Sequence, residues 1–288
     1  MVAINGLTTL YALFGYPARH SYSPLIHNYL FNKHNINSVY LVFEINPCNF
    51  KQSFFGAINI GFCGLNLTMP FKIEALEYLN KIEEDAKKVG SINTIVFNKN
   101  TQESVGFNTD LPGFLKSLHD KKYNITNSVA LVLGAGGVAR SSIYSLIKEN
   151  IKKVYIYNRT IEKAIEIKKM FDVFKNEKII ILKNLDELTR KEYDEIELIV
   201  NCTSVGMNSN NTSLKMPIPE DWSLKNKLVF EMIYEPINTS LVTKAKKEGA
   251  LVINGIDMLI NQAIFSFKIW TGIEPDFKDL KRYLQDKI

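Results

Sequence analysis

Short apolar runs alternate with amphipathic stretches over the whole chain, which is the pattern of strands and helices that follow each other in turn. In the first third, strands are predicted at residues 10–14, 39–45, 62–67 and 93–97. Residues 24–34, 49–58 and 70–79 repeat apolar positions at helical spacing. The polar residues 98–102 are typical of a hairpin loop.

The middle of the chain is more regular, and it predicts strands at residues 129–133, 153–157, 178–182, 198–202, 228–231 and 251–253. These strands are apolar along their whole length, which indicates burial on both faces of a parallel sheet covered by helices. Residues 208–213 are expected to form a surface loop, and a helix is predicted from residue 256 to about residue 271. The pattern therefore predicts an α/β fold.

Composition excludes several classes of protein. The chain has 288 residues, of which 46% are hydrophobic and 23% are charged, so it can bury a large core and is not disordered. At roughly 150 residues per domain, two domains are expected. Lys and Arg exceed Asp and Glu by only 35 to 30, and they are scattered rather than gathered in a stripe, so we expect no nucleic-acid partner.

The remaining composition points to a cytoplasmic protein without a metal. Three dispersed cysteines, and four histidines without ligand spacing, predict neither a disulfide framework nor a metal site. No apolar run approaches the roughly 18 residues of a membrane span, so no membrane partner is expected. No Lys or Arg precedes Arg19, which argues against a secretory signal.

A glycine-rich turn follows the first strand of the middle region. Residues 129–133 run directly into Gly134-Ala-Gly-Gly-Val-Ala139, and a helical stretch comes next. Gly134 permits a tight turn, Gly136 lets the backbone approach a pyrophosphate, and a small residue at Ala139 allows close packing of helix on strand. The N-terminus of the helix then offers N–H groups to phosphates. This context favours a dinucleotide site over a purely structural turn.

The end of the next strand favours NADP over NAD. An NAD site usually has an acidic residue there to bind the ribose 2′-hydroxyl. Here residues 153–157 are followed by Asn158, Arg159 and Thr160, with Lys163 one turn further on. Arg159 can bind a 2′-phosphate through its planar guanidinium, and Lys163 adds a second positive charge. The alternative is a solvated Arg159 in a surface loop.

In three segments of the first third, polar residues stand beside a proline that suits the first turn of a helix. They are Ser21-Tyr-Ser23-Pro24, Asn66-Leu-Thr68-Met-Pro70-Phe-Lys72 and Asn108-Thr-Asp110-Leu-Pro112. Ser23 is a candidate cap and, with Ser21, suits a carboxylate ligand. Lys72 opposes the dipole of its own helix, which suits proton transfer with Asp110 as its partner. On spacing alone, capping by Ser23 and Asp110 and a solvated Lys72 remain the alternatives.

Together these motifs resemble those of the shikimate dehydrogenase family nearly from end to end. The matching segments are Gly15-Tyr-Pro-Ala-Arg-His-Ser-Tyr-Ser-Pro24, Asn66-Leu-Thr-Met-Pro-Phe-Lys72, Gly90-Ser-Ile-Asn-Thr94, Asn108-Thr-Asp110, Gly134-Ala-Gly-Gly137, Asn158-Arg-Thr160, Val200-Asn-Cys-Thr-Ser-Val-Gly206 and Gly255-Ile-Asp-Met-Leu-Ile-Asn-Gln262. The resemblance implies a reversible NADPH-dependent reduction of 3-dehydroshikimate to shikimate, a step of chorismate and aromatic amino-acid biosynthesis.

The resemblance also implies the roles of individual residues. Lys72 is similar to the catalytic lysine, with Asp110 as its partner. The substrate-binding positions implied are Ser21, Ser23, Asn66, Thr68, Asn93, Asp110, Tyr234 and Gln262. The cofactor-binding positions implied are Gly134, Ala135, Gly136, Gly137, Val138, Asn158, Arg159, Thr160, Lys163, Thr203, Met232 and Gly255.

The position of Gln262 decides the predicted domain organisation. This residue lies on the apolar face of the last long helix, where a polar group needs a partner, and a substrate hydroxyl would serve. We therefore predict a smaller α/β substrate domain at residues 1–111, completed by residues 255–288. A Rossmann-type NADP-binding domain at residues 112–254 is inserted between these parts, with a cleft between the two domains. Beyond the small-molecule substrate, the chain is expected to be a monomer or homodimer.

Two positions bear on which cofactor and substrate the chain uses. Lys163 stands where many NADP-using members have arginine, so the contact with the 2′-phosphate is expected to be looser and tolerance of NAD greater. Ser23 favours shikimate over quinate. The alternatives are a quinate/shikimate dehydrogenase with relaxed use of NAD and NADP, and a non-catalytic Rossmann protein that senses nucleotide or shikimate. Such a sensor would not need both Lys72 and Asp110.

Overall fold

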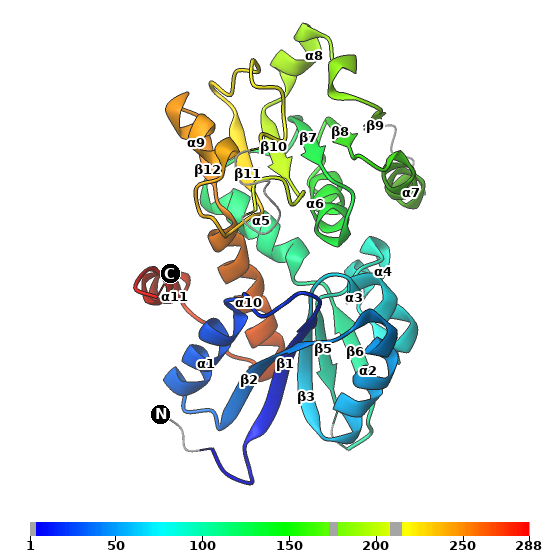
Figure 1. Ribbon diagram of the computed structural model, residues 1–288, viewed down its shortest axis with the longest axis vertical. Coiled ribbons are helices and arrows are strands. Elements are labelled where there is room, and N and C mark those ends of the chain that lie inside the picture. The colour runs from blue at the N-terminus through cyan, green and yellow to red at the C-terminus, as the bar shows by residue number, and fades with distance from the viewer. Residues whose placement is uncertain (1–3, 99, 173–177, 208–214, 288) are drawn as a thin grey trace. The chain divides into compact units, whose positions relative to one another are not determined.

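Two sheets, each of six strands, organise the computed structural model, which describes residues 4–98, 100–172, 178–207 and 215–287 (Figure 1). The chain forms two units, one of Met1–Gly113 with Ile260–Ile288 and the other of Phe114–Leu259. The first unit is only slightly the smaller. Helices α5 (Asp110–Asp120) and α10 (Gly255–Thr271) each run from one unit into the other.

The first unit has a mixed sheet with the order β2-β1-β3-β5-β6-β4. Its elements are β1 (Thr9–Gly15), α1 (Ser23–Lys33), β2 (Ser38–Glu44), a 3₁₀ turn (Pro47–Asn49), α2 (Phe50–Asn59), β3 (Phe62–Leu67), α3 (Phe71–Glu74), a second 3₁₀ turn (Ala75–Tyr78), β4 (Lys81–Ile82), α4 (Glu84–Val89), β5 (Thr94–Phe97), β6 (Ser104–Phe107) and the C-terminal α11 (Phe277–Gln285). Strands β1, β2 and β3 are parallel, whereas β5 is antiparallel to both of its neighbours, β3 and β6.

Helices cover both faces of this sheet (Figure 1). On the face covered by α2, α3 and α4, Phe50 stacks on Phe71 with ring centroids 4.1 Å apart. On the other face, which α1 and α10 cover, Tyr11 packs against Trp270 at 4.8 Å. The four predicted strands are present within one or two residues of their expected ends. Strands β4 and β6 were not predicted, because they are short and carry too few apolar residues to show a period.

The second unit has an all-parallel sheet with the order β12-β11-β10-β7-β8-β9. Its elements are β7 (Val129–Leu133), α6 (Gly137–Lys148), β8 (Lys153–Tyr157), α7 (Ile161–Asp172), β9 (Ile179–Leu182), a 3₁₀ turn (Leu185–Glu187), α8 (Arg190–Glu195), β10 (Leu198–Asn201), β11 (Leu228–Glu231), α9 (Ser240–Lys247) and β12 (Leu251–Ile253). This order is that of a Rossmann-type doubly wound sheet, so the predicted fold class is confirmed. The loop predicted at residues 208–213 lies outside the described residues.

Two local predictions need correction. The helix predicted over residues 70–79 is a single α turn, α3, followed by a 3₁₀ turn, so Lys72 has no long helix behind it and the dipole argument for it is weak. Ser23 is the first residue of α1 and does not cap it, because the N-cap is Tyr22, and the N–H of Ser23 itself donates to Ser21 Oγ. Ser23 is thus free of a capping role.

Candidate active site

A lysine–carboxylate pair lies at the centre of a polar cluster in the first unit. Lys72 of α3 and Asp110 at the start of α5 approach to 2.6 Å between Nζ and Oδ2, although they are far apart in the sequence. Their side chains are only 12% and 6% exposed. The chain beside Lys72 is fixed in turn, because the Ile92 N–H donates to the Lys72 carbonyl at 2.8 Å.

Asp110 is available to Lys72 because a neighbour caps its helix. Asn108 accepts a hydrogen bond from the Leu111 N–H through Oδ1 at 3.0 Å, and its Nδ2 donates to the Ser91 carbonyl at 2.8 Å. Side-chain oxygens in such positions satisfy the free N–H groups of a helix start. The carboxylate of Asp110 is therefore left to other partners, and capping is not its role.

Two amide side chains extend the cluster. Asn93 donates through Nδ2 to Asp110 Oδ1 at 2.9 Å and to Gln262 Oε1 at 3.4 Å. Gln262 comes from α10, and a close approach holds it there: a Cβ on Gly113 would lie 2.9 Å from the backbone nitrogen of Gln262. Asn93 is itself fixed, because its Oδ1 accepts from the Thr109 N–H at 2.8 Å.

Asn66 is buried and makes all its hydrogen bonds within the protein. Its Oδ1 accepts from the Tyr40 hydroxyl at 2.8 Å, and its Nδ2 donates to the Asn93 carbonyl at 3.0 Å. The same Nδ2 also lies within 3.2 Å of Ser266 Oγ. Asn66 thus positions Asn93, and the structure gives it no spare donor for a ligand.

The serine pair forms a second polar group, at the N-terminus of α1. Ser21 Oγ accepts from the Ser23 N–H at 3.2 Å and lies 3.1 Å from Ser23 Oγ. Ser21 is half-buried and Ser23 is buried. Thr68 is half-buried beyond the end of β3, and its N–H donates to the Phe14 carbonyl. The first unit thus holds every predicted substrate-binding residue except Tyr234, which belongs to the second unit.

Three hydroxyl residues of this cluster escaped the sequence analysis. Thr109 Oγ1 lies 3.1 Å from Ser266 Oγ and 3.5 Å from Gln262 Oε1. Thr94 Oγ1 lies 2.8 Å from Ser266 Oγ. Each is buried, and each adjoins a motif residue: Thr94 and Thr109 are chain neighbours of Asn93 and Asp110. Ser266 stands four residues after Gln262, on the same face of α10, and this spacing is the signal that could have revealed it.

The glycine turn of the second unit has the shape that a pyrophosphate requires. Gly134 has φ +107°, and a Cβ there would lie 3.0 Å from the Cys202 carbonyl oxygen, so only glycine fits without strain. Gly136 is exposed, and a Cβ on it would meet nothing within 4 Å. Gly136 is also the N-cap of α6, and no side chain caps this helix start. Ala135 is buried beneath the turn. These residues fit a dinucleotide.

The tip of β8 has the charge expected for a 2′-phosphate. Asn158 donates through Nδ2 to the Thr160 carbonyl at 2.7 Å and so shapes the turn. Arg159 and Lys163 are exposed, and within the described parts of the chain neither forms an ion pair. Positions 158–160 carry no carboxylate. The side chains present at this tip therefore suit NADP better than NAD.

The other predicted cofactor positions follow β10, β11 and β12, the three strands on one side of β7. Thr203 comes two residues after β10, and its hydroxyl donates to Asn201 Oδ1 at 2.7 Å. Met232 directly follows β11. Gly255 follows β12, and a Cβ on it would lie 2.5 Å from the Met232 carbonyl oxygen, which makes a larger residue impossible there without movement of the backbone.

Two further features are absent from the described residues. No group of His, Cys, Asp and Glu that could hold a metal ion occurs among them. No helix among them is long and apolar enough to cross a membrane.

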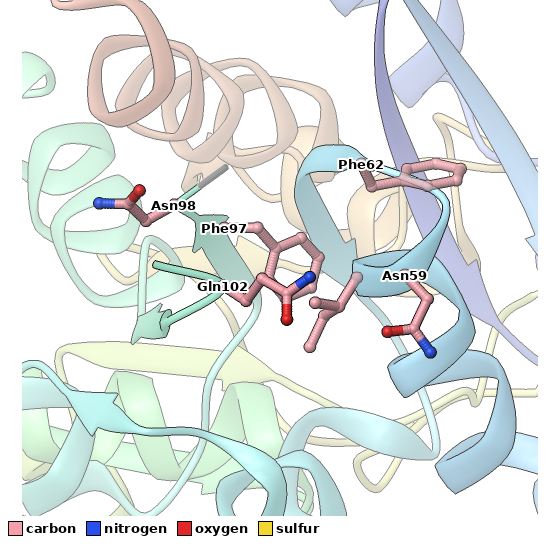
Figure 2. A pocket seen from close by; sticks show the side chains of 7 residues that line it. Asn59, Phe62, Phe97, Asn98 and Gln102 are labelled. Atoms are coloured by element: carbon pink, nitrogen blue, oxygen red, sulfur yellow. The ribbon is translucent and has the colours of Figure 1, made fainter. Parts of the chain in front are cut away.

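A pocket occurs at the amino end of β3, lined by Asn59, Phe62, Phe97 and Gln102 among others (Figure 2). It lies at the opposite end of β3 from Asn66, so it is separate from the candidate site.

A Rossmann-type unit with an open glycine turn, and a polar cluster built on a lysine–aspartate pair, define a dinucleotide-dependent oxidoreductase of small molecules. The family described as the shikimate dehydrogenase substrate binding domain matches residues 13–95. The shikimate/quinate 5-dehydrogenase family matches residues 117–214, and the shikimate 5′-dehydrogenase C-terminal domain matches residues 255–282. The chain belongs to the shikimate dehydrogenase family.

Individual relatives agree with this assignment. The chain is 38% identical to the NADP(+) shikimate dehydrogenase of Aquifex aeolicus over 98% of each chain, and 35% identical to that of Methanocaldococcus jannaschii over 99% of each. The crystal structure of the A. aeolicus enzyme matches with a TM-score of 0.89 and covers 99% of this chain and 100% of its own. That of Thermus thermophilus shikimate 5-dehydrogenase in complex with NADP(H) and shikimate matches with a TM-score of 0.84 at 27% identity, over 97% of this chain and 100% of its own. The predicted family is confirmed.

Proposed function

We propose that this protein catalyses the reversible reduction of 3-dehydroshikimate to shikimate with NADPH. The buried Lys72–Asp110 ion pair is the observation that carries this proposal, because a paired lysine in a polar site can give a proton to a carbonyl oxygen. The relatives support it, since those named above are NADP(+) shikimate dehydrogenases or are crystallised with NADP(H) and shikimate. No observation favours the quinate or the non-catalytic alternative.

In the reaction, bound NADPH supplies a hydride to the C3 carbonyl carbon. Lys72 donates a proton from Nζ to the developing oxyanion, and in the reverse direction the same Nζ removes the proton of the C3 hydroxyl. Asp110 steadies Lys72 through Oδ2, while its Oδ1 is held by Asn93. Because both carboxylate oxygens are engaged, Asp110 fixes the direction in which Lys72 points.

The surrounding residues hold the substrate. Ser21 and Ser23 bind its carboxylate, since their hydroxyls lie side by side at the N-terminus of α1 and Ser23 does not cap this helix. Asn93 and Gln262 bind ring hydroxyls, since Asn93 contacts Asp110 and the amide of Gln262 lies beside that of Asn93. Thr68 and Tyr234 contribute further contacts. Asn66 acts through Asn93, because its own hydrogen-bonding groups are satisfied within the protein.

In this proposal the two units bind different ligands. The first unit, Met1–Gly113 with Ile260–Ile288, binds the substrate, and the second unit, Phe114–Leu259, binds NADP. In the second unit the Gly134 turn holds the pyrophosphate, and Arg159 with Lys163 holds the 2′-phosphate. Thr203, Met232 and Gly255 lie at the nicotinamide end. Three free cysteines suit the reducing conditions of the cytoplasm, where we place the protein as a monomer or homodimer.

One substitution with a matched control tests the catalytic pair. Lys72→Met should lower kcat for shikimate oxidation by about 10²–10⁴-fold, which is the usual contribution of a general acid–base group. Lys81→Met is the control, because Lys81 pairs with Glu103 in the same unit but is 64% exposed. Turnover is followed by NADPH absorbance with shikimate or quinate against NADP or NAD. Near-normal turnover of Lys72→Met, or no activity of the wild type with any combination, would refute the proposal.

A further inference from the structure

A buried carboxylate outside the catalytic cluster lies at the end of β11 in the second unit. Glu231 ends β11 and pairs in register with Asn201, which ends the neighbouring strand β10. Both residues are fully buried. Asn201 Nδ2 lies 2.9 Å from one oxygen of Glu231 and 3.1 Å from the other. No Lys or Arg of the described residues pairs with Glu231, so this carboxylate is not half of an ion pair.

The other neighbours of Glu231 are donors as well. The Ile233 N–H donates to Oε1 at 3.1 Å, and the Thr239 hydroxyl donates to Oε2 at 2.9 Å. Thr239 is the N-cap of α9, and its Oγ1 also accepts from the Val242 N–H. Burial raises the pKa of Glu231 to about 7, while the hydrogen bonds from Asn201, Ile233 and Thr239 act in the opposite direction. The surroundings are therefore built for an acceptor on both oxygens.

Glu231 joins the loops that follow β10 and β11, beside a backbone hydrogen bond from the Met232 N–H to the Asn201 carbonyl at 3.1 Å. After β10, Asn201 in turn holds Thr203. Its Oδ1 accepts hydrogen bonds from the Thr203 N–H at 3.1 Å and from the Thr203 hydroxyl at 2.7 Å. After β11, Glu231 holds Ile233, the residue after Met232. Gly255 also lies against the Met232 and Ile233 backbone, so this loop has close neighbours in both Glu231 and Gly255.

We propose that Glu231 is a positioning residue for the nicotinamide end of the cofactor, setting Thr203 through Asn201 and Met232 through Ile233. This inference rests on the proposed function, because only there are Thr203 and Met232 assigned to the nicotinamide. A glutamine at position 231 has one acceptor oxygen in place of two, so its NH₂ group must face a donor. The side chain then loses the hydrogen bond from either Ile233 or Thr239, together with one of its two contacts with Asn201. The Gly134 turn and Arg159 keep their own contacts.

The test compares two ligands that share only one end. NADP⁺ carries the nicotinamide, whereas adenosine 2′,5′-bisphosphate carries only the part bound by Arg159 and Lys163. Glu231→Gln should weaken NADP⁺ binding in calorimetry by about tenfold, as expected for a lost hydrogen bond to a charged group. It should leave adenosine 2′,5′-bisphosphate binding and the KM for shikimate unchanged and should lower kcat. Glu197→Gln is the matched control, because Glu197 is exposed and lies at the opposite end of β10.

A second pair of variants keeps the proposal falsifiable if Glu231→Gln does not fold. Thr239→Val removes one donor to Glu231 and should reproduce the selective loss of NADP⁺ affinity, and Thr239→Ser should restore it. Equal weakening of both ligands, a fall in Tm without any change in NADP⁺ binding or kcat, or wild-type behaviour of Thr239→Val would overturn the proposal. If the wild type failed to oxidise shikimate, the proposed function would fail, yet the comparison of the two ligands would still decide the role of Glu231.

Discussion

Replacement of His27 by phenylalanine should make the first unit more resistant to acid. His27 lies on α1 and is completely buried, with its ring stacked on Tyr40 at 4.5 Å between centroids. Trp270 packs against the same ring at 5.1 Å. Neither ring nitrogen has a hydrogen-bond partner, and burial lowers the pKa of His27 to about 3. The site therefore accepts only the neutral imidazole.

The size of the effect follows from the two protonation states. An unfolded histidine has a pKa near 6.5, so between pH 6.5 and pH 3 the unfolded chain binds a proton that the folded chain does not. The free energy of unfolding is therefore unaffected by His27 above pH 6.5 and falls as the pH drops toward 3. Between about pH 7.5 and pH 5 the loss amounts to about 2 kcal/mol, at about 1.4 kcal/mol per pH unit below 6.5. His27→Phe removes this loss and keeps the stacking.

The assay is denaturant unfolding at both pH values, followed by tryptophan fluorescence. The chain has two tryptophans, and Trp222 belongs to the other unit, so a Trp222→Phe background leaves Trp270 as the reporter beside position 27. His20→Phe is the control, because His20 is exposed. If His27→Phe and the wild type lose stability in parallel between the two pH values, the assignment of a buried neutral imidazole is wrong.

Two further predictions concern the cofactor and the packing of the site. Arg159→Ala should raise the KM for NADP about tenfold or more and leave that for NAD nearly unchanged, because a charge-assisted contact with the 2′-phosphate is lost; equal effects on both cofactors would contradict this, and Arg190→Ala, also exposed and in the second unit, is the control. Gly113→Ala should lower the free energy of unfolding by about 1–3 kcal/mol and raise the KM for shikimate, since the new methyl group would displace Gln262. In α2, a methyl group added at Gly56 would meet no atom within 4 Å, so Gly56→Ala should raise the free energy of unfolding by about 1 kcal/mol. Equal effects of the two glycine substitutions would refute the packing argument.

Local sequence patterns were enough to predict the strands of the second unit. Its strands are continuous apolar runs, and four of them have the predicted limits to the residue, because burial on both faces of a parallel sheet leaves a strong local pattern. The Gly134 turn was equally readable, since a positive φ and a close approach can be met only by glycine. In the first unit, the strands β4 and β6 were missed because a short strand held mainly by its neighbours has no period of its own.

The candidate site was predicted in part, and the missing part depends on contacts between distant segments. Motifs identified Lys72 and Asp110, but their 2.6 Å contact exists only because α3 and α5 meet in the folded unit. Sequence spacing could not show that Asn108 caps α5 and so leaves Asp110 free. Nor could it show that the amide of Asn66 is already satisfied within the protein.

The sequence by itself determined the family, the α/β class, the position of the dinucleotide turn and the identity of the chemical groups, because each of these is written in short segments. The tertiary structure decided which of those groups touch one another. It brought Gln262 of α10 beside Asn93 and joined Glu231 to Asn201 across two strands. Buried polar groups find their hydrogen-bond partners only when the chain packs and water is excluded from them. A local sequence pattern therefore cannot predict these partners.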